Sequence, residues 1–379
     1  MDRRTLLGAL ASATTTGLVL PQLAAAATSG GSEAAPPAGP VAGPGPRNLI
    51  TDVRGLKVGL AQDPKVATGA TIILPDTPAV AACDVRGGGP ATRETDALTP
   101  ENLVQVVDAI MLSGGSVYGM AAADGVIAAM GASGRGFSMG ARPGVPPSPI
   151  VPTACLYDLA NGGDKSWGEN PPYRKLGLKA FRAAGETFEL GAKGAGYGAM
   201  SGGLKGGLGS ASIVSADGFT VGAIVAVNSL GSAIAPGGKQ FWAAPFEING
   251  EFGGLGTAEL KGAPEAYRPD LPPPAPRQNT TIACIATDVA LTRVELKRVV
   301  IMAQDALARA LRPVHAPFDG DVVFGLSTGV IEAPDTAPRS VLSMRLGALA
   351  ADTLARAIAR AVYEATAIPV SDNPAWRDL

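Results

Sequence analysis

The junction Asn279-Thr280, in the stretch "PPPAPRQNTTIACIATD" (272–288), offers hydrolytic chemistry that needs no histidine. Proline fixes φ and has no N–H, so residues 272–276 are predicted to form a surface loop that ends at Asn279. If the peptide bond after Asn279 breaks, Thr280 gains an α-amine, whose ordinary pKa of about 7.7 to 8 suits a general base. Nucleophile and base then lie in one residue. Asn-Thr before a strand is also a common structural pattern, so the junction alone permits self-cleavage without requiring it.

The single histidine, His315, restricts the other catalytic options. A Ser-His-Asp or Cys-His mechanism would have to use it, and in "RPVHAPFDGD" it lies between prolines with no sequence clue to a serine partner. A histidine in such a loop is usually structural. The G-x-S-x-G turn of lipase-type esterases is missing too, because in "SGGSVYGM" Gly119 follows Ser116 by three residues. Histidine-dependent esterase chemistry is therefore disfavoured.

Two further motifs carry polar side chains within turn-like sequence. The glycine-rich passage "GAKGAGYGAMSGGLKGGLGSAS" (191–212) matches neither phosphate-loop pattern, so it is either a close-packed turn or backbone held against a substrate. In the second case Lys205 would supply the charge. The motif "FDGDVVF" places Asp319 and Asp321 directly before an apolar run, a position that by itself is typical of a turn.

Composition excludes several classes of partner. Net charge is −2, from 31 basic and 33 acidic residues, and gives no reason to expect a nucleic acid or a membrane surface. Cys83, Cys155 and Cys284 have no metal-ligand spacing and form no even set, so no metal site and no disulfide framework are predicted. Cys155 and Cys284 are expected in the core. We therefore expect the protein to act on a small-molecule substrate without a cofactor.

The N-terminus is typical of an export signal. Residues 1–27 contain Arg3-Arg4, a mildly apolar run and an A-x-A cleavage pattern near Ala26, which together predict a twin-arginine-type signal peptide. Residues 28–47 form a linker rich in Pro, Gly and Ala. One catalytic domain is predicted over 48–379. The protein is thus expected to be exported to the periplasm or the cell exterior.

Apolar runs and helical periodicity alternate through this domain. Buried strands are predicted at 70–75, 221–227, 281–287 and 322–327, where short runs are rich in β-branched residues. Helices are predicted over 99–112, 292–313 and 340–366. Mixed strands and helices indicate a layered α/β protein.

Two of the predicted helices carry further signals. The second has a capping box of Thr292 and Glu295 and ends at Pro313. The third is apolar around most of its circumference, so it should be buried between layers or at a subunit contact.

Several ordered motifs, spread from about residue 48 to residue 365, resemble the autoprocessed hydrolases of the L-aminopeptidase/D-Ala-esterase/amidase family, and in particular its nylon-oligomer (6-aminohexanoate-oligomer) hydrolase branch. The resemblance implies a four-layer α/β/β/α sandwich, similar to N-terminal nucleophile hydrolases but differently connected. It also implies self-cleavage into an α chain ending at Asn279 and a β chain over 280–379. Many members use Ser as nucleophile, and Thr280 matches the nylon branch. The motifs are "MLSGGSVYGMAAADGV", "PIVPTACLYDLANG", "SGGLKGGLGSAS", "VGAIVAVNSLGS", "NTTIACIATDVALTRVELKRV" and "ARALRPVHAPFDGDVVFGLSTG".

The resemblance implies roles for individual side chains around the nucleophile. Asp319 and Asp321 would orient its amine and hydroxyl, and a carboxylate beside an amine raises the amine's pKa. Asn228 matches an asparagine whose N–H groups stabilise the oxyanion. Lys205 matches a lysine near the nucleophile, and Tyr157 matches a tyrosine of the substrate pocket.

The substrate class implied is a linear amide, either a nylon oligomer or a small peptide, and the sequence leaves endo- and exo-action open. Family members assemble as tetramers or larger sets of the cleaved αβ unit, so a homo-oligomer is expected. Two alternatives remain. An acyltransferase similar to ornithine acetyltransferase also uses an N-terminal Thr, and would transfer its acyl group to an added amine. A non-enzymatic exported binding protein would stay one uncut chain.

Overall fold

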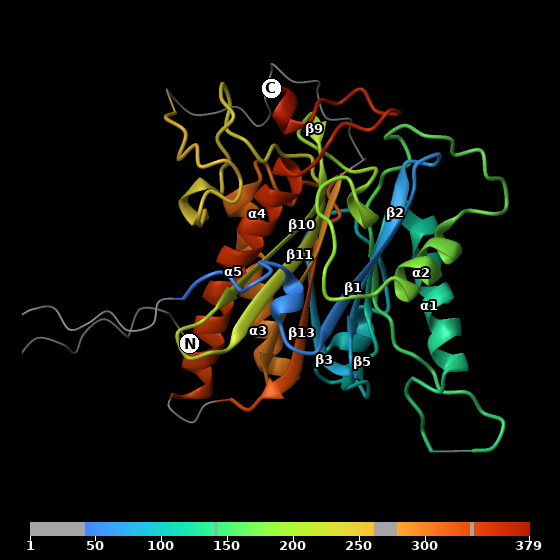
Figure 1. Ribbon diagram of the computed structural model, residues 1–379. Helices are drawn as coiled ribbons and strands as arrows, with labels where there is room; N and C mark the ends of the chain where they lie inside the picture. Colours follow the sequence, from blue (N-terminus) through green and yellow to red (C-terminus); the bar gives the residue numbers. More distant parts are fainter. Residues whose placement is uncertain (1–41, 141, 261–278, 334–336) are drawn as a thin grey trace, which may run out of the picture. The chain divides into compact units, whose positions relative to one another are not determined.

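Two β-sheets face each other and carry helices on their outer sides (Figure 1). The computed structural model describes residues 42–140, 142–260, 279–333 and 337–379. The first sheet has the strand order β10 (Gly207–Val214), β11 (Thr220–Asn228), β12 (Thr280–Val289), β13 (Val322–Ile331), β3 (Ala79–Val85), β5 (Val106–Val107). The second has the order β1 (Leu56–Asp63), β2 (Thr68–Pro75), β6 (Ile110–Ser113), β7 (Thr153–Cys155), β4 (Ala91–Arg93). A two-stranded ribbon pairs β8 (Met200–Ser201) with β9 (Leu204–Lys205).

Five α-helices complete the outer layers within the described residues. The first sheet is covered by α3 (Arg293–Ala303), α4 (Asp305–Ala310) and α5 (Arg339–Tyr363). The second is covered by α1 (Ala121–Ala132) and α2 (Tyr173–Arg182). One hydrophobic cluster lies between each sheet and its helices, and a third lies between the sheets. The predicted four-layer α/β/β/α sandwich is confirmed.

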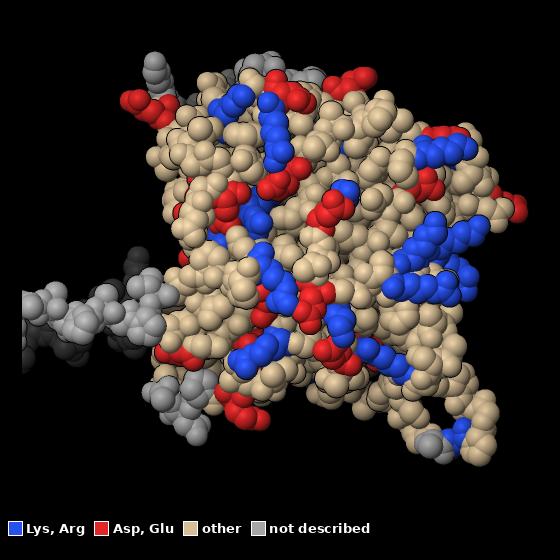
Figure 2. All heavy atoms as spheres, viewed as in Figure 1, with Lys and Arg blue, Asp and Glu red and all other residues tan. Residues whose placement is uncertain are grey.

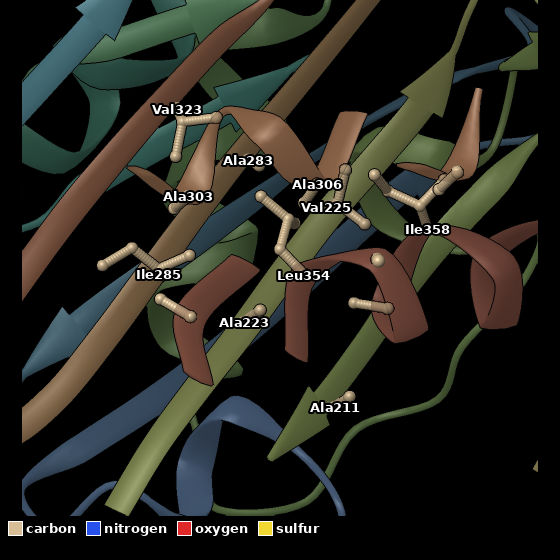
Figure 3. Packing of buried hydrophobic residues seen from close by; sticks show 14 of the residues in the cluster. Ala211, Ala223, Val225, Ala283, Ile285, Ala303, Ala306, Val323, Leu354 and Ile358 are labelled. Atoms are coloured by element: carbon tan, nitrogen blue, oxygen red, sulfur yellow. The ribbon is translucent and has the colours of Figure 1, made fainter. Parts of the chain in front are cut away.

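The central strand β12 is buried along its whole length, and its residues 282–286 are apolar on both faces. Successive side chains of a strand point to opposite faces. Ile282 and Cys284 accordingly belong to the cluster between the sheets, whereas Ala283 and Ile285 belong to the cluster under the helices. Figure 3 shows the latter two in the same cluster as Leu354 of α5. The strands predicted at 70–75, 221–227, 281–287 and 322–327 all form, as β2, β11, β12 and β13.

Helix α5 is buried as predicted, and small residues beneath it allow its close approach to the sheet. A Cβ added to Gly209 would lie 1.9 Å from the Ala357 carbonyl oxygen, and one added to Gly207 would lie 2.4 Å from that of Ala361. No Cβ tolerates such distances, so any other residue at these positions would push the helix outward.

The helix predicted over 99–112 is wrong. This segment forms β5 and β6 after a short 3-10 turn at Asp96–Leu98. Strand β6 lies between β2 and β7, where both of its faces are buried. The Asp108 carboxylate accepts hydrogen bonds from the Ile150 N–H (2.9 Å) and from Arg135 Nε (3.2 Å), which holds the backbone extended. Periodicity does not separate a short buried strand from a buried helix, and here the tertiary pairing decides.

The helix predicted over 292–313 forms with its capping box but is interrupted. Glu295 N–H donates to Thr292 Oγ1 (3.3 Å), and Thr292 N–H donates to Glu295 Oε2 (2.8 Å). The break at Gln304 separates α3 from α4, and the Gln304 side chain donates to the Asp84 carbonyl (2.8 Å). The helical part ends three residues before Pro313.

The predicted signal peptide, residues 1–27, and most of the predicted linker lie outside the described residues. Two glycines of the linker segment are bound to β10: Gly43 exchanges hydrogen bonds with Val214, and Gly45 N–H donates to Ser212 Oγ (3.1 Å).

Charges of both signs are interspersed over the face in Figure 2, with one cluster of basic residues over α2. Arg174, Lys175, Lys179 and Arg182 are exposed on that helix. Within the described parts of the chain, no helix is both long and apolar enough to cross a membrane.

Candidate active site

The chain junction predicted to be cut lies at one end of the first sheet. Asn228, the last residue of β11, pairs with Thr280, the first residue of β12. Directly opposed residues of an antiparallel pair point to the same face, and this is the face of Ile282, toward the second sheet. Because β13 runs parallel to β12, residues 319–321 reach the same end of the sheet.

The Thr280 hydroxyl is enclosed beside the bond that it would attack. Its residue is 3% exposed, and Oγ1 donates a hydrogen bond to the carbonyl oxygen of Asn279. On another side lies Gly320, where an added Cβ would sit 2.7 Å from Oγ1. Glycine at position 320 therefore leaves the space that the hydroxyl occupies.

Asp321 ties the start of β12 to the loop before β13. Its Oδ1 accepts from the Thr281 N–H (2.9 Å), and its Oδ2 lies within hydrogen-bond distance of both the His315 N–H (3.1 Å) and His315 Nδ1 (2.9 Å). His315 adopts a left-handed backbone, with φ of 54°. The only histidine thus contacts an acid of the candidate site, a contact that its sequence position between prolines did not indicate.

Asp319 is the second acid of this loop and is 2% exposed. It accepts from the Ala316 N–H (3.1 Å) and from the Leu230 N–H (3.3 Å). Burial, and then the negative charge of Asp321, raise the pKa of Asp319 to about 6. Between about pH 4 and pH 6, the folded chain therefore holds a proton that the unfolded chain releases.

This proton gives a testable pH dependence of stability in the uncut chain, which the structure describes. When a carboxyl has a higher pKa in the folded state than in the unfolded state, the folded protein loses stability as the pH rises between those two pKa values, here from about 4 to 6. Replacing Asp319 by Asn in a Thr280→Ala background should remove a loss on the order of 2 kcal/mol between pH 4 and pH 7. Urea unfolding at both pH values measures it. Asp372→Asn, at an exposed position, is the control, and an unchanged pH dependence in Asp319→Asn would contradict the assignment.

Asn228 has its amide held on both sides. Its Oδ1 accepts from the Met200 N–H (2.9 Å) and from Asn161 Nδ2 (3.0 Å), and its Nδ2 donates to the Tyr157 carbonyl (3.0 Å). Tyr157 therefore contacts this network through its main chain, and its half-buried ring makes none of these bonds. Asn161 was missed from the sequence, because "LANG" has only the signal of a turn.

Lys205 is fully buried inside the glycine-rich passage. Its ammonium donates to the carbonyls of Gly196 (3.2 Å), Ala199 (2.7 Å) and Gly206 (2.8 Å). Burial lowers its pKa to about 7. Lys205 thus holds the loop whose Met200 N–H binds Asn228, and its connection to Asn228 runs through that loop.

A second missed residue, Asp158, anchors the segment next to Tyr157. Its buried carboxylate accepts from Thr68 Oγ1 (2.6 Å) and from the Gly115 N–H (2.8 Å). Burial raises its pKa to about 6. Gly115 belongs to the "SGGS" motif, which does not match the esterase turn. Through Gly115 this motif binds Asp158, the residue that follows Tyr157.

No group of His, Cys, Asp and Glu side chains in the described parts of the chain has a metal-binding arrangement. The three cysteines are free, and burial raises the pKa of the Cys83 thiol to about 12. Cys284 is buried in the hydrophobic cluster between the sheets, and Cys155 is buried in strand β7. These thiols are poorly ionised at neutral pH, so they are poor nucleophiles.

The family model described as peptidase family S58 matches residues 48–374. The chain belongs to peptidase family S58. An uncharacterized aminopeptidase of Mycobacterium tuberculosis is 42% identical over 355 residues, covering 88% of this chain and 98% of the relative. The 6-aminohexanoate-oligomer endohydrolase of Kocuria sp. is 29% identical over 338 residues, covering 85% and 88%.

A solved structure agrees with the fold of this S58 peptidase. The L-aminopeptidase D-Ala-esterase/amidase of Ochrobactrum anthropi, described as a variant of the Ntn hydrolase fold, has a TM-score of 0.62 at 22% identity. The match covers 85% of this chain and 87% of that chain. The predicted family resemblance and the predicted amide-bond hydrolase are thereby confirmed. The alternative of a non-enzymatic binding protein is not supported.

Proposed function

We propose that this S58 peptidase cleaves its chain between Asn279 and Thr280 and then uses Thr280 as an N-terminal nucleophile on linear amides. The observation that carries the proposal is the buried Thr280 hydroxyl, bound to the Asn279 carbonyl at the start of a central strand. Attack of Oγ1 on that carbonyl carbon moves the acyl group from nitrogen to oxygen. Water then hydrolyses the ester, leaving a carboxylate on Asn279 and a free amine on Thr280.

The same residue would then act on a substrate. The Thr280 amine takes the proton of its own hydroxyl as Oγ1 attacks the substrate carbonyl, and the side-chain amide nitrogen of Asn228 donates to the carbonyl oxygen as it becomes negative. The protonated amine gives its proton to the leaving nitrogen, and the product amine departs. Water hydrolyses the remaining ester, which releases the acid and restores Thr280.

The substrate class that we propose is linear aliphatic amides, either 6-aminohexanoate oligomers or small peptides. The endohydrolase name of the Kocuria relative supports the first, and the aminopeptidase name of the mycobacterial relatives supports the second. Phe318, 45% exposed beside the buried acids, supplies apolar surface for methylene chains. We also propose, from the sequence, export by residues 1–27 and assembly of the cleaved units into a homo-oligomer.

Intact mass of the purified protein under denaturing conditions tests the cleavage. We expect two fragments, the smaller beginning at Thr280, and hydrolysis of 6-aminohexanoate oligomers or peptides by the cut protein. Substrates with a blocked N-terminus separate endo-action, which tolerates the block, from exo-action. A single uncut chain that hydrolyses these amides would contradict the proposal. Acyl transfer to added ornithine at a rate above hydrolysis would favour the acyltransferase.

A further inference from the structure

An asparagine serves as an oxyanion donor only if its nitrogen, and not its oxygen, faces the developing charge. The two ends of the amide have nearly the same shape, so packing does not distinguish them and hydrogen bonds must. We infer that Asn161 is a positioning residue that, together with the Met200 N–H, holds the Asn228 amide in place. The inference rests on the proposed oxyanion role of Asn228.

The orientation follows from backbone groups whose donor or acceptor character is fixed. The Met200 N–H can only donate, so the Asn228 atom that it meets must be oxygen. The Tyr157 carbonyl can only accept, so the atom that it meets must be nitrogen. The Gly198 carbonyl can likewise only accept, and it binds Asn161 Nδ2 at 2.9 Å. Asn161 therefore presents its second N–H to Asn228 Oδ1, at 3.0 Å.

Asn161 is itself held rigidly. It is 4% exposed, and its own N–H donates to the Asp158 carbonyl (3.1 Å). The next residue, Gly162, has φ of 85°, and a Cβ there would lie 1.9 Å from the Val370 carbonyl oxygen. The Asn161 side chain is therefore a fixed donor. Its bond to Asn228 Oδ1 adds to the bond from the Met200 N–H, and both bonds favour the same orientation of the Asn228 amide.

Asn161→Asp tests the inference, because the new side chain has the same shape but, when ionised, can only accept. The carboxylate would repel Asn228 Oδ1, whereas the Met200 N–H and the Tyr157 carbonyl oppose rotation of that amide by 180°. The Asn228 nitrogen should therefore be displaced from its position. We expect kcat per cleaved chain to fall on the order of 10²-fold with little change in KM. Burial raises a carboxyl pKa, so lowering the pH should protonate the group, restore a donor and bring the variant closer to wild type.

Controls separate this inference from the proposed function and from misfolding. Asn161→Ala, which removes the donors without adding charge, should lose less kcat and show no recovery at low pH. Asn102→Asp, at an exposed amide that also donates to a backbone carbonyl, should match wild type. If Asn228→Ala keeps full kcat, the oxyanion role itself fails. If Asn228→Ala loses kcat and folded Asn161→Asp does not, the inference is overturned. Should Asn161→Asp remain uncut, its rate of self-cleavage as the pH is lowered is the readout, and no recovery overturns the inference as well.

Discussion

Thr280→Ala is expected to purify as one chain with the Asn279–Ala bond intact, and to hydrolyse no amide. The substitution removes the hydroxyl that is both the proposed cleaving group and the proposed nucleophile, so the two activities should disappear together. The side chain is 3% exposed at the first residue of β12, and the shorter alanine leaves only a small cavity. The fold should therefore survive, which circular dichroism and thermal unfolding can verify.

Thr280→Ser is the matched variant, because it keeps the hydroxyl on the same Cβ and loses only a methyl group. It should be cut at the same junction and should hydrolyse the same substrates, at a reduced rate. Intact mass and N-terminal sequencing measure the first effect, and product release measures the second. Cleavage of Thr280→Ala at the native junction would remove the hydroxyl from the mechanism.

Asp321→Asn is expected to slow substrate hydrolysis on the order of 10²-fold and to shift its pH dependence. The carboxylate accepts from the Thr281 N–H and from the backbone N–H of His315. An amide has one acceptor oxygen and one nitrogen, so one of these N–H groups would face another donor. The backbone beside Thr280 then loses its fixed position, and small displacements of a nucleophile cost large factors in rate.

The direction of the pH shift follows from the charge that is removed. A nearby carboxylate raises the pKa of an amine, and the Thr280 amine must be neutral to act as a base. Wild-type kcat/KM should therefore rise with pH through the amine pKa, and Asp321→Asn should move this rise to lower pH. His315→Gln keeps both the carboxylate and a side-chain donor, so it should shift the profile less. A profile of Asp321→Asn that coincides with wild type would exclude a charge effect on the amine.

Three strands of the first sheet, β11, β12 and β13, could be predicted because their apolar content is a local property, whereas β3, β5 and β10 were not predicted. β11, β12 and residues 322–327 of β13 are buried on both faces, so short continuous runs of apolar and β-branched residues indicate them directly. The capping box of Thr292 and Glu295 is local as well. The segment 99–112 was mispredicted because its apolar residues fit two periodicities, and only pairing with β2 and β7 selects the strand.

The layered α/β class and the family resemblance could be recognised in the sequence, because each rests on the type and order of residues near one another. Cleavage at the Asn279-Thr280 junction stays a prediction. Which side chains lie close to the junction could be seen only in the folded chain. Asn161 binds Asn228 across 67 residues of chain, and the Thr281 N–H binds Asp321 across 40. Such contacts depend on the register between strands and on how loops close over the sheet ends, and a hydrogen bond between distant segments leaves no periodic trace in either one.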